Sequence, residues 1–82
     1  MKRLITSDQI RAARALLRWT ADDLANAANI GIATVRRFES SDGVPSGQVR
    51  ILGALKLALE SAGVEFIGTP EEGPGVRLVR MI

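Results

Sequence analysis

Two adjacent arginines, Arg36 and Arg37, are the residues of this sequence best suited to molecular recognition. The planar guanidinium of Arg37 can donate two hydrogen bonds to O6 and N7 of a guanine, and Arg36 is of the type that contacts phosphate. Ile32 and Ala33 just before them could pack against the methyl groups of thymines. Two arginines on a helix are more commonly a solvated surface, so the interpretation depends on the elements that carry them.

The composition gives little support to other chemistry. The 82 residues include no His, Cys or Tyr, so the commonest general base, thiolate ligands and disulfides are all missing. Asp22 and Asp23 are adjacent on an expected helix and therefore do not face one site together. Gly73-Pro74-Gly75 lacks the strand and helix that flank a phosphate-binding loop. We expect no catalytic activity, no metal and no cofactor, in a chain that fits a reducing, intracellular setting.

The isoelectric point suggests a more basic protein than the net charge does. The isoelectric point is about 9.9, yet the net charge is only +2, because almost nothing titrates between the carboxylates and the lysines. Residues 1–20 hold five positive charges and one negative, residues 21–63 four and five, and residues 64–82 two and three. The positive excess therefore lies in the first segment, and composition alone is weak evidence for a nucleic-acid partner.

The first two expected helices begin at recognisable capping residues. The hydroxyl of Thr6 lies three residues before Gln9, which is the pattern of a capping box. Thr20 can cap a second helix that extends to Ala28. Asn29 tolerates the left-handed conformation in which helices end, so it should separate this helix from the next.

A third and a fourth helix follow from the apolar spacing. The third runs from residue 32 to about 40, and a loop rich in Ser and Gly leads to Ser46, which can cap a fourth helix ending before Gly63. Val49 and Leu57 fall off the apolar stripe of the fourth helix, so either the C-terminal segment covers them or a partner does. The stripe itself consists of Ile51, Leu52, Leu55, Ala58, Leu59 and Ala62.

The C-terminal segment is expected to be β-structure. Residues 64–67 and 76–82 have strand composition, and the glycines and prolines of residues 68–75 favour neither regular state. The last segment is apolar on both faces, and an isolated hairpin is marginal, so it could fold back, pair across a dimer or stay mobile. The expected partner or dimer surface comprises Val49, Leu57, Val76, Leu78, Val79 and Met81.

Two short helices joined by about three residues are the outline of a helix-turn-helix. In residue types and spacing as well as in outline, residues 8–62 resemble the Cro/phage-repressor-like (Xre) helix-turn-helix family. The agreement extends over residues 10–20, Leu24-Ala25, residues 28–31 and Thr34-Val35-Arg36-Arg37-Phe38-Glu39. The resemblance implies a mainly α, four-helix domain over residues 1–63, with residues 64–82 as a short C-terminal β-hairpin or dimer-pairing strands of the same domain.

The resemblance also implies roles for individual residues. Arg14 and Glu39 match a partly buried ion pair that joins the first helix to the end of the third. Gly31 stands where the family usually has a Ser or Thr cap. Base-edge positions correspond to Gly31, Ile32, Ala33 and Arg37, and phosphate or flanking contacts to Thr34, Arg36, Ser40, Ser41 and Gly43.

These observations predict a sequence-specific DNA-binding transcriptional regulator. It would act as a homodimer whose third helices lie about 34 Å apart on a pseudo-palindromic, double-stranded operator. The alternative is a helix-turn-helix scaffold that captures a protein, as an antiactivator binds a transcription factor or an antitoxin a toxin. The start lacks the apolar region of a signal peptide, and no apolar run is long enough to span a membrane, so a cytoplasmic protein is expected.

Overall fold

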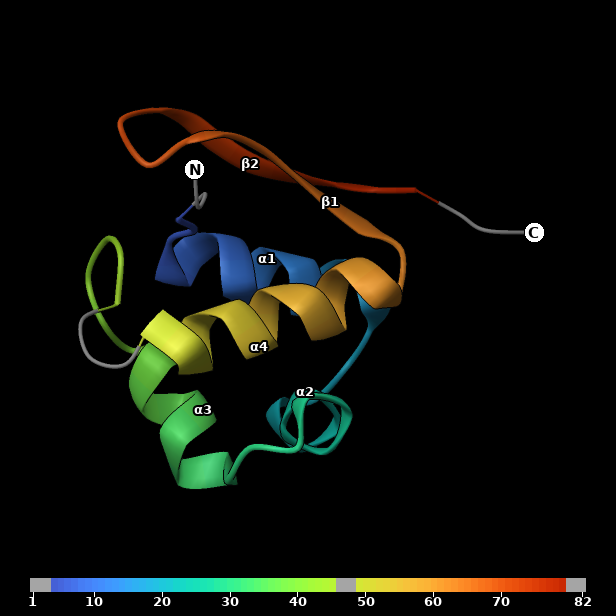
Figure 1. Ribbon diagram of the computed structural model, residues 1–82. Coiled ribbons are helices and arrows are strands. Elements are labelled where there is room, and N and C mark those ends of the chain that lie inside the picture. The colour runs from blue at the N-terminus through green and yellow to red at the C-terminus, as the bar shows by residue number, and fades with distance from the viewer. Residues whose placement is uncertain (1–3, 46–48, 80–82) are drawn as a thin grey trace.

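The computed structural model, which describes residues 4–45 and 49–79, contains helices followed by a β-hairpin (Figure 1). The mainly α fold with a C-terminal antiparallel hairpin is confirmed. The described elements are α1 (Ser7–Leu17), α2 (Ala21–Ala28), α3 (Ile32–Glu39), α4 (Val49–Ser61), β1 (Val64–Thr69) and β2 (Glu72–Leu78).

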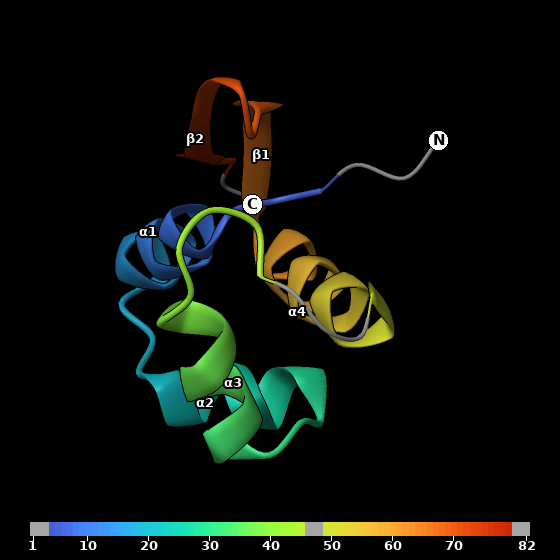
Figure 2. The same ribbon diagram turned by 90° about the vertical axis from the view of Figure 1, so that its left-hand side faces the viewer.

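The helices are arranged in two tiers beneath the hairpin. α1 and α4 lie beside each other under the two strands, and α2 and α3 lie at the opposite end of the molecule (Figures 1 and 2). β2 contacts α1, and β1 contacts both α1 and α4. The hairpin is therefore supported by its own chain, which answers one alternative left open by the sequence.

The starts of α1 and α2 confirm the predicted capping residues. The backbone N–H of Gln9 donates to Thr6 Oγ1 at 3.1 Å, and the backbone N–H of Thr6 donates to the Gln9 side chain at 2.8 Å. Thr20 and Asp23 form the same reciprocal pair at the start of α2. Asn29 ends α2 in the left-handed region, at φ 58° and ψ 47°. Local polar groups thus satisfy the backbone donors that a helix start leaves free.

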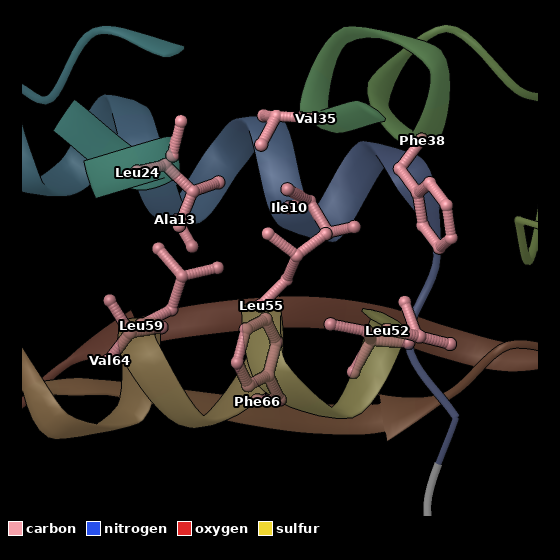
Figure 3. Packing of buried hydrophobic residues seen from close by; sticks show 12 residues of the cluster. Ile10, Ala13, Leu24, Val35, Phe38, Leu52, Leu55, Leu59, Val64 and Phe66 are labelled. Carbon is pink, nitrogen blue, oxygen red and sulfur yellow. The ribbon is translucent and has the colours of Figure 1, made fainter. Parts of the chain in front are cut away.

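One hydrophobic core joins all six elements (Figure 3). Ile10 and Ala13 of α1 face the α2–α3 pair on one side and α4 on the other. Phe66 of β1 closes the core beneath the hairpin. The fully or almost fully buried apolar residues are Ile5, Ile10, Ala13, Leu24, Ala25, Val35, Phe38, Leu52, Leu55, Leu59, Val64 and Phe66.

The hairpin is longer than the sequence indicated, and the expectation that residues 68–75 lack regular structure is wrong. Gly75 pairs with Ile67, and Glu72 pairs with Thr69, with an irregularity between Ile67 and Thr69. A Cβ atom on Gly68, whose φ is +74°, would lie only 2.1 Å from the Gly73 carbonyl oxygen. The absence of a side chain at Gly68 is thus what allows the two backbones to approach this closely.

The residues of the predicted partner surface differ in their exposure in the structure. Val49 and Leu57 on α4 are exposed, as is Val79 after β2. Val76 and Leu78 are half-buried against the chain's own core, so only part of each side chain could meet a partner. Met81, the end of the predicted last strand and the Ser46 cap lie outside the described residues. Across the described ranges, no helix has the length and apolar character needed to cross a membrane.

Candidate nucleic-acid interface

The candidate site is built on α2, α3 and the three-residue connection between them. After Asn29, the backbone N–H of Ile30 donates to Ala25 O at 2.9 Å, and the Ile30 side chain packs against the core. α3 then starts at Ile32, after the N-cap residue Gly31, and packs against both α1 and α2. Its inner face is fixed by the buried side chains of Val35 and Phe38. The opposite face of α3 is left to solvent.

That outer face carries the two arginines singled out in the sequence. Arg36 and Arg37 are exposed, and neither forms an ion pair with any residue in the described ranges. The Arg37 guanidinium carbon lies 5.5 Å from the centre of the Phe38 ring, which orients the group without using its N–H donors. Four of the other cations in the described ranges, Arg11, Arg14, Lys56 and Arg77, are paired with carboxylates, whereas Arg18 and Arg50 are not.

The C-terminal end of α3 is held by groups from α1. The buried Ser7 hydroxyl donates to Phe38 O at 2.7 Å, and the Arg11 guanidinium donates to Glu39 O. The Arg11 guanidinium also pairs with Asp8. A cation and a hydroxyl at these carbonyls satisfy acceptors that the last turn of a helix leaves free. α1 therefore fixes the position of α3 along its axis.

The Arg14–Glu39 ion pair strengthens the same junction. Arg14 Nε lies 2.8 Å from Glu39 Oε2, and Arg14 Nη2 donates to Glu39 Oε1 at 3.0 Å. Arg14 Nη1 donates to the Trp19 carbonyl oxygen at 3.0 Å, so the guanidinium also holds the chain leading to α2. The hydrogen bond to Glu39 is the main cause of a raised Arg14 pKa; partial burial opposes it, and the attraction between the two charges adds to it.

The first turn of α3 offers mostly small or apolar groups to a ligand. Gly31 is exposed and caps the helix without a side-chain hydrogen bond. Ala33 is exposed, whereas Thr34 is half-buried. Ile32 is half-buried and packs against the core, so only part of its side chain can meet a thymine methyl group. Hydrogen bonding to bases from α3 would thus depend mainly on Arg37.

The polar groups of the loop after α3 make hydrogen bonds within the chain. The hydroxyls of Ser40 and Ser41 both donate to Arg37 O at 3.1 Å, so their protons already serve the end of α3. The carbonyl of Gly43, a residue at φ +66°, accepts a hydrogen bond from the Ser7 N–H at 2.9 Å. These contacts secure the loop to α1. Phosphate contacts from the loop would then depend on its backbone N–H groups rather than on hydroxyl protons.

The acidic groups near α2 and α3 differ in their contacts. The Asp23 carboxylate accepts the Thr20 N–H at 2.8 Å, so this side chain is part of the cap at the start of α2. Asp22 is exposed in the same first turn, and Asp42 is exposed in the loop after α3. Within the described ranges, no group of three or more His, Cys, Asp or Glu side chains could hold a metal ion.

Compared with known proteins, the chain matches no family model and no curated protein. The assignment of the site therefore depends on its residues and geometry. Sequence reasoning did not anticipate that Ser7 and Arg11 hold the end of α3. Their partners are 31 and 28 residues away, and a serine or an arginine in a first helix carries no local signal for such a contact.

Proposed function

We propose that the protein is a sequence-specific DNA-binding transcriptional regulator of the Cro/phage-repressor-like helix-turn-helix class, acting in the cytoplasm as a homodimer. One observation carries the proposal. α3 follows α2 after a three-residue connection, and its solvent face holds Arg36 and Arg37 without carboxylate partners in the described chain. Unpaired arginines on the second helix of such a unit are suited to the negatively charged major groove.

In the proposed complex, α3 is the recognition helix. Arg37 donates to a guanine edge, Ala33 and the exposed part of Ile32 contact thymine methyl groups, and Arg36 binds phosphate. The contacts from α1 to the end of α3 would fix the direction of the helix before DNA arrives. Such preorganisation lowers the ordering cost of binding.

Protein capture on the same scaffold is the second candidate. The exposed Leu57 on α4 favours it, because large apolar side chains in solvent are common at protein-binding surfaces. In that function the protein would bind a transcription factor or a toxin through α4. DNA affinity would then be weak at any salt concentration.

Selection of bound sites from a random DNA pool, followed by footprinting, tests the proposal. We expect a pseudo-palindromic protected sequence, and Arg37→Ala should weaken binding by about tenfold to a hundredfold while relaxing preference at one position in each half-site. Arg77→Ala on the hairpin is the matched control and should leave affinity unchanged. Unchanged affinity in Arg37→Ala would show that α3 is not the recognition helix, and the lack of a protected sequence at moderate salt would refute DNA binding.

A further inference from the structure

The outward face of α4 is the most apolar exposed surface among the described helices. Leu57 is 64% exposed and Val49 is 51% exposed, on a helix whose opposite face is fully buried. Leu57 borders two hollows at once. One, of about 330 Å³, is shared with Leu4 and Gly53; the other, of about 440 Å³, lies between α4 and α2 and is shared with Trp19. The exposed Leu57 side chain thus lies next to two hollows in the surface.

The spacing along α4 makes this face complementary to itself. Leu55 is fully buried, so the line that points to solvent runs directly opposite it. At about 100° per residue, Gly53 and Leu57 lie on either side of this line and at equal distances from Leu55. If a second α4 packs antiparallel with a two-fold axis at Leu55, each Leu57 meets the bare backbone at Gly53 of the other copy. A two-fold interface requires this self-complementarity, with a projection and a recess on one surface.

The charges on the same face follow the same symmetry. Arg50 and Glu60 also lie at equal distances from Leu55, on opposite sides of the outward line. Arg50 is exposed and has no carboxylate partner in the described ranges, whereas Glu60 accepts from Lys56 Nζ at 2.8 Å. An antiparallel pair brings each Arg50 beside Glu60 of the other copy, at both ends of the contact. A parallel pair would set like charges against each other.

We propose that the outward face of α4 is the interface between two copies of this chain. Leu57 of each copy packs over Gly53 of the other, and Arg50 pairs with Glu60 across the two-fold axis. The inference deepens the proposed function, since it rests on the homodimer proposed there and places its contact on α4. On the hairpin, by contrast, Val76 and Leu78 already pack in part against the chain's own core.

Sedimentation equilibrium of the full chain without DNA tests this interface. We expect a dimer for the unaltered chain, and Leu57→Ser should raise the dimer dissociation constant about 100-fold, because the apolar side chain is removed from both copies. Leu16→Ser is the matched control, because it changes another exposed apolar residue, on α1, and should leave the constant within about threefold. Circular dichroism should show that both variants keep their helices.

Exchanging the charges of Arg50 and Glu60 tests the same interface independently of the Leu57 contact. Arg50→Glu should weaken the dimer, and Arg50→Glu combined with Glu60→Arg should restore most of the affinity, because the exchanged charges again face each other. A monomeric unaltered chain, an unaffected Leu57→Ser dimer, or no recovery in the exchanged variant would overturn the interface. Since mass is measured without DNA, a monomer that still binds an operator refutes the homodimer and its interface but not DNA binding, and a dimer that binds none refutes only the DNA-binding function.

Discussion

Glu39 is the residue at which most of the contacts between α1 and α3 meet. Its carboxylate, with a side chain only 9% exposed, pairs with Arg14, and its main-chain oxygen accepts from Arg11. Removing one partner from a buried ion pair leaves the other charge poorly compensated, which costs more than removing a surface pair. The pair is therefore expected to position α3 as well as to stabilise the fold.

The raised pKa of Arg14 does not make this contribution sensitive to pH near neutrality. A base whose pKa is higher in the folded state stabilises the fold fully below its unfolded pKa and loses that effect only as pH rises through the folded value. For an arginine, that interval lies far above neutral pH. The guanidinium side of the Arg14–Glu39 pair is thus constant over the range in which proteins usually work.

Glu39→Gln tests the contribution of the pair to stability. We expect the free energy of unfolding to fall by about 2 kcal/mol, because the amide keeps one acceptor but removes the charge facing Arg14. Glu65→Gln is the matched control. Its partner Arg77 is 67% exposed at the side chain, and such surface pairs contribute less than about 1 kcal/mol. Urea unfolding measures both, and equal decreases would contradict the special role given to Glu39.

At the scale of elements, Gln9 connects the start of α1 to the hairpin. Its side-chain oxygen accepts from the Thr6 N–H, and its Nε2 donates to Ile67 O at 3.2 Å and to Gly75 O at 2.9 Å. One amide therefore completes a helix cap and joins both strands. The donor half of this amide explains why a glycine-rich hairpin, marginal on its own, has a fixed place on α1.

Gln9→Glu separates the two roles of the amide. The carboxylate keeps an acceptor for the cap but has no donor for the strands, so hairpin amides should exchange hydrogen at least about tenfold faster at neutral pH. Thr6→Val, which removes the hydroxyl half of the cap, is the control and should affect the first turn of α1 more than the hairpin. Hydrogen exchange followed by NMR distinguishes the two patterns. Unchanged protection of β1 and β2 in Gln9→Glu would show that other contacts hold the hairpin.

The sequence predicts elements well where their signals are local. The capping pairs at Thr6 and Thr20 place the starts of α1 and α2, and Asn29 marks the end of α2. The end of α1 carries no such signal, because Arg18 takes the left-handed conformation at φ 58°, which arginine rarely adopts. Local sequence does not predict the extended hairpin either, since its support comes from core packing and from Gln9, which is 58 and 66 residues away from the two carbonyls that it binds.

In the candidate site, too, local features could be predicted from the sequence and contacts between distant segments could not. Periodicity places Arg36 and Arg37 away from the core, and the structure has both of them exposed. Spacing along one helix cannot show which cations elsewhere are neutralised. It also cannot show that Ser40 and Ser41 donate to the Arg37 carbonyl.

At the scale of the whole molecule, the ion pairs determine where uncompensated positive charge lies. The net charge is only +2, and two of the cations on α1, Arg11 and Arg14, are offset by carboxylates. The unpaired arginines of α3 lie at the end of the molecule opposite the hairpin (Figure 1). An almost neutral chain therefore has unpaired basic side chains at this end, as the proposed function requires, and a dimer would have two such sets.

The salt dependence of binding to the selected operator tests the central claim most directly. In the proposed complex, Arg36 of each of two copies neutralises one phosphate and about two counterions are released. The logarithm of the association constant should therefore fall against the logarithm of salt concentration with a slope of about −2. Arg36→Ala should make this slope less steep by about one for each phosphate that is no longer neutralised, whereas Arg77→Ala should leave it unchanged. A slope of this size that depends on Arg36 is the result we predict, and no binding at low salt, or binding indifferent to salt, would contradict it.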